Sequence, residues 1–100
     1  MKIKLNNLLI LLDADTEKCL VNILASKHLI LPTNSSQIMQ QMASILETSL
    51  DQQKIHAQLQ KIAQQNIIEL KNVSIKNEAG FEIIQINSEK LYHYYHEILN

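Results

Sequence analysis

Thr48–Leu70 reads TSLDQQKIHAQLQKIAQQNIIEL, and this stretch decides the fold that we predict. Ser49 is a favourable helix N-cap, and Gln52 stands where a capping box requires a glutamine. Apolar residues then recur at the spacing of one helix face, at Ile55, Leu59 and Ile62. The sequence therefore predicts an amphipathic helix that begins at Ser49 and runs to Gln65.

A β-hairpin is predicted directly after this helix. Asn66 tolerates the left-handed backbone conformation that often ends a helix. Two β-rich segments, Ile68–Ile75 and Phe81–Ile86, then flank the polar segment Lys76–Gly80, which contains the chain's 1 glycine. Two such segments around a short glycine-containing loop are typical of a hairpin.

Two helices are predicted before this stretch. Residues 14–29 form an apolar helix that we expect to be central, and acidic residues stand at its predicted start, at Asp13, Asp15 and Glu17. Asn34 can cap the next helix, with Gln37 returning the hydrogen bond. The expected buried face of that helix consists of Ile38, Met42, Ile45 and Leu46.

The two ends of the chain complete the predicted order. Residues 1–12 are compatible with either a strand or a helix, because Lys2–Leu5 alternates whereas the leucines that follow have helical spacing. Asn87 or Ser88 caps a last helix that extends to about Leu99. Its predicted buried face consists of Leu91, Tyr95 and Ile98.

The predicted fold class is mainly α, in an α+β arrangement with a three-helix core, a β-hairpin and a C-terminal helix. The 100 residues suit one domain, in which 1–15 form an N-terminal element, 16–86 the core and hairpin, and 87–100 the last helix. Neighbouring elements tend to pack together, and this arrangement is the simplest one that buries every apolar face.

This order resembles the winged helix-turn-helix superfamily over about Thr16–Ile86. The segment Gln53–Leu70 is similar to the recognition helix and first wing strand of MarR-type regulators, with Asn66 in place of the usual glycine. A second resemblance is to the N-terminal winged-helix domain of DnaD-type primosomal proteins. It rests on Asn7-Leu8-Leu9, the apolar helix through Leu24, Leu31-Pro32-Thr33, Gly80-Phe81-Glu82 and Leu91-Tyr92.

The resemblance implies a DNA-reading surface on the helix from Ser49 to Gln65 and on the wing. Glutamine can pair with adenine in the major groove, and lysine can reach a phosphate or a guanine. The expected double-stranded DNA contacts are Gln53, Lys54, His56, Gln60, Lys61, Gln64 and Lys76. The alternative is that these residues form an ordinary solvated helix face, and the formal net charge of -1 gives no strong electrostatic attraction to DNA.

A homodimer is the second expectation, because tyrosine is common at interfaces and winged-helix regulators often dimerise through terminal elements. The expected interface residues are Leu8, Leu9, Leu12, Tyr92 and Tyr94. The alternative is that both ends simply pack on the core.

Other chemistry finds little support in the sequence. His93, His96 and Glu97 have a spacing that could hold the edge of a metal site, but a solvated helix face is the simpler interpretation. Cys19 lies on the apolar helix and is expected to be a buried thiol. We predict no catalytic residues, no metal and no cofactor.

The setting and the function follow as predictions. The single cysteine and the short apolar run Leu8–Leu12 indicate a cytoplasmic protein with no membrane partner. The leading hypothesis is a small winged-helix DNA-binding protein, acting as a dimeric transcriptional regulator. The alternative is a winged-helix module that binds a protein partner in a replication or primosome-type complex.

Overall fold

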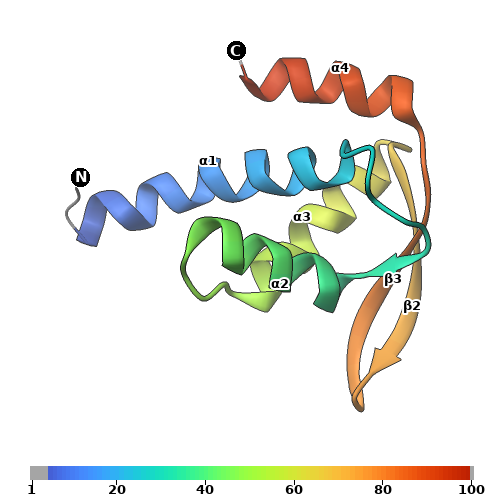
Figure 1. Ribbon diagram of the computed structural model, residues 1–100, viewed down its shortest axis with the longest axis horizontal. Coiled ribbons are helices and arrows are strands. Elements are labelled where there is room, and N and C mark those ends of the chain that lie inside the picture. The colour runs from blue at the N-terminus through green and yellow to red at the C-terminus, as the bar shows by residue number, and fades with distance from the viewer. Residues whose placement is uncertain (1–4, 100) are drawn as a thin grey trace.

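The chain folds as an α+β structure with four helices and one antiparallel sheet among its described residues (Figure 1). The computed structural model describes the backbone of residues 5–99 and the side chains of residues 15–98. The elements in chain order are α1 (Leu5–Leu24), β1 (Thr33–Asn34), α2 (Ser35–Leu46), α3 (Gln52–Gln64), β2 (Ile68–Ile75), β3 (Glu78–Ile86) and α4 (Ser88–Leu99). The predicted order of helices and hairpin is confirmed, and β1 is an addition that the sequence pattern did not indicate.

The central helix α1 differs from the prediction at both ends. It is continuous from Leu5 to Leu24, so its first half covers most of the predicted N-terminal element 1–15, of which residues 1–4 lie outside the described backbone. Asp13, Asp15 and Glu17 lie within this helix rather than at its start. The helix ends at Leu24 instead of residue 29, and the Ser26 hydroxyl then accepts a hydrogen bond from the His28 N–H at 3.1 Å.

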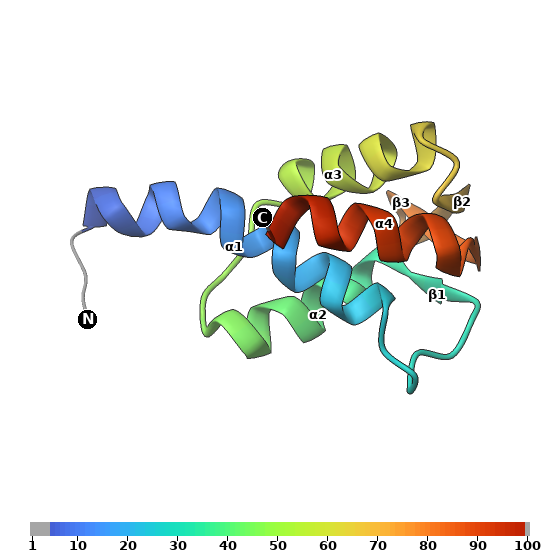
Figure 2. The same cartoon turned by 90° about the horizontal axis from the view of Figure 1, so that it is seen from above.

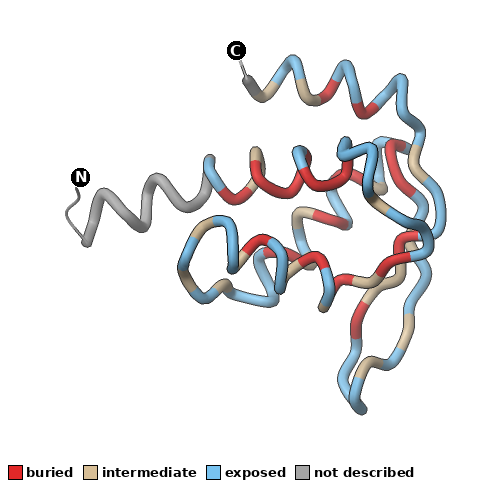
Figure 3. The backbone as a smooth tube through the Cα atoms, viewed as in Figure 1, coloured by how far each residue is buried: buried red, intermediate tan, exposed pale blue. Residues whose placement is uncertain are grey.

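The core forms where the second half of α1 meets the other helices and the sheet (Figures 2 and 3). Leu20 and Val21 of α1 have no exposed surface, and the inner face of α3 is equally closed. Each buried aliphatic side chain of this size contributes about 1.5–3 kcal/mol to folding. Hydrophobic burial therefore fixes which face of each helix is left to solvent.

The sheet has the strand order β1-β3-β2, and all its pairs are antiparallel. The β2–β3 turn is shorter than predicted, because it consists of Lys76 and Asn77 alone, with φ of 52° and 69°. Two consecutive residues in the left-handed region form the tight turn that suits a twisted hairpin. A bulge after Glu69 leaves Ile84 without a cross-strand partner, since Glu69 pairs with Gln85 and Leu70 with Ile83.

Gly80 lies inside β3 and not in the turn where the sequence placed it. A Cβ atom there would meet Ile75 Cδ1 at 2.7 Å and Ser35 Oγ at 3.2 Å. This close approach allows Ser35 Oγ to accept a hydrogen bond from the Phe81 N–H at 3.0 Å. The glycine thus allows the first residue of α2 to join the sheet.

Three predicted helix caps and ends are confirmed, and one predicted side-chain hydrogen bond is replaced by another. Asn34 caps α2 by accepting a hydrogen bond from the Gln37 N–H at 2.9 Å. Asn87 does the same for α4 with the Lys90 N–H at 3.0 Å, and Asn66 has the predicted left-handed φ of 62°. The Gln37 side chain does not complete a capping box, since its oxygen accepts a hydrogen bond from the Thr33 hydroxyl instead.

Candidate functional site

The outer face of α3 is the surface on which most of the predicted contacts lie. We define this outer face as the exposed residues Gln53, Ala57, Gln60, Lys61 and Gln64. The opposite, inner face of the helix consists of Ile55, Leu59 and Ile62, and each of these side chains is at most 1% exposed. Helical geometry then directs the outer residues away from the core. Lys54 is also exposed and belongs to the same helix.

The start of α3 is set by Asp51, which corrects the prediction of Ser49. The Asp51 side chain accepts a hydrogen bond from the Gln53 N–H at 3.0 Å, and the helix begins at Gln52. Ser49 is exposed and precedes the helix, whereas its neighbour Leu50 packs partly against the core.

His56 does not belong to the outer face, contrary to the prediction. It is half-buried, and its ring lies edge-on to Phe81 of β3 with the ring centroids 5.0 Å apart. Its Nε2 atom is buried and has no hydrogen-bond partner among the described residues. His56 therefore joins α3 to the hairpin instead of facing solvent.

Lys61 is part of a polar cluster that links three helices. Its Nζ atom lies 3.3 Å from Glu17 Oε2 of α1, and the same oxygen accepts a hydrogen bond from the Tyr94 hydroxyl of α4. Tyr94 is 94% buried in the core, given its exposed fraction of 6%. Burial raises the pKa of the Tyr94 hydroxyl far above its ordinary value, and the bond to Glu17 raises it further.

The hairpin carries carboxylates as well as lysines. Lys76 is exposed at the tip, as predicted, but Lys71 of β2 pairs across the strands with Glu82 of β3. Glu78 adds a second carboxylate next to the turn. The fold therefore brings a carboxylate of β3 opposite Lys71, the one lysine of β2, and places another beside the turn that holds Lys76.

The predicted dimer surface is only partly present. Tyr92 is 62% exposed on α4, whereas Tyr94 is buried and hydrogen-bonded, so Tyr94 was wrongly assigned to an interface. The side chains of Leu8, Leu9 and Leu12 lie outside the described side chains, and their part of the prediction stays a prediction. Sequence spacing could not separate the two tyrosines, because α4 packs on α1 along the Leu91 and Tyr94 face.

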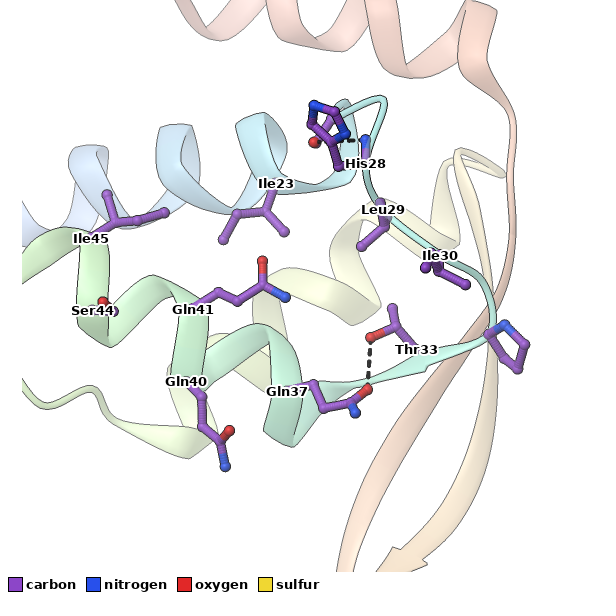
Figure 4. A pocket seen from close by; sticks show the side chains of 12 residues that line it. Ile23, His28, Leu29, Ile30, Thr33, Gln37, Gln40, Gln41, Ser44 and Ile45 are labelled. Carbon is purple, nitrogen blue, oxygen red and sulfur yellow. Dashed lines mark hydrogen bonds between the residues drawn. The ribbon is translucent and has the colours of Figure 1, made fainter.

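A groove between α1, α2 and the segment joining α1 to β1 was not predicted (Figure 4). This α1–α2 groove has a volume of about 780 Å³ and includes Ile23, Leu29, Ile30, Gln41 and Ile45 in its lining. Ile30 is 81% exposed and Ile45 61% exposed, which corrects the assignment of Ile45 to the buried face of α2. The signal in the sequence was the row of apolar residues Leu29-Ile30-Leu31, which had no assigned partner.

Metal and thiol chemistry gain no support from the geometry. Within residues 15–98, no group of three or more His, Cys, Asp or Glu side chains could hold a metal ion. Cys19 is buried, as predicted, and burial raises the pKa of its thiol, so the reactive thiolate is disfavoured. In the described part of the chain, no helix combines the length and apolar character needed to cross a membrane.

Comparison with known proteins adds no relative to this description. No family model, no curated protein and no solved structure matches the chain.

Proposed function

We propose that this chain is a winged-helix protein that binds duplex DNA with the outer face of α3 and the β2–β3 hairpin. The proposal is supported by the order α1-β1-α2-α3-β2-β3, in which α3 follows α2 after a short turn and leads directly into the hairpin. In helix-turn-helix proteins, the second helix of the pair enters the major groove. Here that helix is α3.

The observation that carries the proposal is the composition of the outer face of α3. Gln53, Gln60 and Gln64 are exposed along one side of the helix, with Lys61 beside them. A glutamine amide can donate to and accept from the edge of an adenine, and a lysine can bind a phosphate or a guanine. A buried inner face and an outer face of amide and ammonium groups suit a helix that contacts the major groove.

The charges set how strongly this surface would bind. Lys54, Lys61 and Lys76 are the lysines of α3 and the hairpin tip, and the net charge of the chain is only -1. Three phosphate contacts give a slope of about -3 in log K against log salt concentration. We therefore expect modest affinity per protomer, with a steep but not extreme dependence on salt.

A duplex-binding titration at two salt concentrations tests the proposal. Affinity should fall with salt at about the slope given above, and Lys54→Ala and Lys61→Ala should each weaken binding and reduce the slope by about 1. Lys27→Ala is the matched control, because Lys27 is equally an exposed lysine but lies between α1 and β1. Equal loss in all three variants, or no binding at low salt, contradicts the assignment of α3 as the DNA-binding helix.

A second copy of the chain is the partner that we propose for Tyr92. This tyrosine is 62% exposed on α4 and makes edge-on contact with His96, at 4.4 Å between ring centroids. Two copies would present two α3 helices and would double the number of lysines available to one duplex. Measurement of molar mass in solution, for the wild type and for Tyr92→Ser, tests this part alone.

The second candidate function is protein binding through the α1–α2 groove. Ile30 and Ile45, at 81% and 61% exposure, favour it because exposed large apolar side chains gathered in one depression are typical of protein-binding sites. The low net charge fits this function as well. If the DNA titration shows no binding, this is the function that the remaining surface supports.

A further inference from the structure

Glu17 of α1 lies outside the outer face of α3 but contacts Lys61, which belongs to that face. We infer that Glu17 restrains the DNA affinity of α3 by holding Lys61 against α1, while Tyr94 of α4 keeps the Glu17 carboxylate in place. The inference rests on the proposed function, and it assigns a regulatory role to residues that lie outside the DNA-binding face itself.

The geometry places one carboxylate oxygen between two donors. Glu17 Oε2 lies 3.3 Å from Lys61 Nζ, and it also accepts the hydrogen bond from the Tyr94 hydroxyl. The Glu17 side chain is 23% exposed, whereas that of Lys61 is 60% exposed. The carboxylate is therefore held in the protein, and the lysine is the mobile partner at the edge of the outer face.

Tyr94 makes this contact more than an ordinary surface ion pair. Exposed pairs contribute little because both long side chains lose conformational freedom when they meet. Here the Tyr94 hydroxyl already orients Glu17. The Glu17 side chain therefore loses little further conformational freedom when it contacts Lys61, because the packing of α4 has already ordered it. A hydrogen bond to an ionised acceptor is also stronger than one between neutral groups.

The contact competes with DNA for the same ammonium group. A phosphate can use Lys61 fully only after the lysine has left Glu17, and a carboxylate that remains nearby repels the phosphate. The net effect of Glu17 is to lower the affinity of the one lysine in the last turn of α3. Any movement of α4 that withdraws Tyr94 would loosen Glu17 and release Lys61.

The test compares Glu17→Gln with Glu89→Gln in the duplex titration. Both variants remove one negative charge, but Glu89 lies on the exposed first turn of α4, and no described residue forms a hydrogen bond or ion pair with it. Glu17→Gln should bind DNA about two- to fivefold more tightly at low salt, as expected for release of a partly exposed pair. Glu89→Gln should change affinity by less than about twofold.

A double-mutant cycle separates the Lys61 contact from a general effect of charge or stability. The gain from Glu17→Gln should disappear in a Lys61→Gln background, because no ammonium group is then left to release. An equal gain in that background, or an equal gain in Glu89→Gln, overturns the inference. If the wild type binds with the expected salt slope and Glu17→Gln changes nothing, the inference fails while the proposed function stands.

A measurement without DNA checks the contact itself. In an alkaline titration followed by tyrosine absorbance, burial and the bond to Glu17 should make Tyr94 ionise late, and Glu17→Gln should move this ionisation to lower pH. Identical titration curves for the wild type and Glu17→Gln would overturn the cluster on which the inference is built. If neither the wild type nor Glu17→Gln binds DNA, both the inference and the proposed function are overturned.

Discussion

The outer face of α3 and the α1–α2 groove lie on different sides of the molecule, and of the two the groove alone exposes large apolar side chains beside its glutamines. Figure 2 shows α2 and α3 on the two sides of α1. The outer face carries glutamines and Lys61, whereas the groove carries exposed isoleucines at positions 30 and 45. Amide and ammonium groups suit base edges and phosphates, while apolar side chains suit another protein surface. The two candidate functions therefore belong to separate surfaces and can be tested separately.

The largest expected effect is on the free energy of unfolding, and it comes from the buried inner face of α3. Leu59→Ala removes a side chain with no exposed surface and should lower the free energy of unfolding by ~3 kcal/mol, because it leaves a cavity under α3. Gln60→Ala, one residue further and exposed, should change it by less than ~0.5 kcal/mol. Urea denaturation of both variants measures the difference. Similar losses in the two would mean that α3 is oriented differently from the structure.

The next largest effect comes from the hydrogen bond that the Tyr94 hydroxyl donates to Glu17. Tyr94→Phe should lower the free energy of unfolding by ~1.5 kcal/mol at neutral pH, because Glu17 loses a hydrogen bond to its ionised form. The wild type should also lose stability as pH rises above about 10, where an unfolded tyrosine ionises but buried Tyr94 keeps its proton. The stability of Tyr94→Phe should decline less over that range. Denaturation at pH 7 and pH 10.5 tests both parts, and parallel curves would contradict the second.

A smaller effect distinguishes the observed cap of α3 from the predicted one. Asp51→Ala should cost ~1 kcal/mol, since the Gln53 N–H loses its acceptor at the helix start. Ser49→Ala should cost almost nothing, because Ser49 is exposed and precedes the helix. The same denaturation assay decides between them. The opposite ranking would restore the earlier helix start.

The comparison also shows what the sequence could and could not predict. The inner face of α3, the left-handed Asn66 and the caps Asn34 and Asn87 are local properties of the chain, and the structure confirms each of them. The errors arose where a distant segment decides the outcome. His56 is turned towards Phe81 and Tyr94 towards Glu17, and these partners are far away in sequence.

Other segments of the chain also decide whether β1 forms and how far Ile45 is buried. Two residues, Thr33 and Asn34, are too few to produce an alternating pattern, and they form a strand only because β3 offers an edge. Ile45 has the spacing of a buried residue, but its side chain lines the α1–α2 groove and is 61% exposed. Periodicity predicts which residues share a face and not how closely a neighbouring element packs against it.

The smallest expected effect comes from the groove itself. Ile30→Ser and Ile45→Ser should each change the free energy of unfolding by less than ~0.5 kcal/mol, because most of each side chain is already in contact with water. Ile38→Val, a milder change at a fully buried position of the same helix α2 as Ile45, should cost more, at ~1 kcal/mol. DNA affinity should stay unchanged in both serine variants, since neither residue lies on α3. A serine variant that loses DNA binding without losing stability would show that the groove contributes to DNA binding, and the two surfaces would then not be independent.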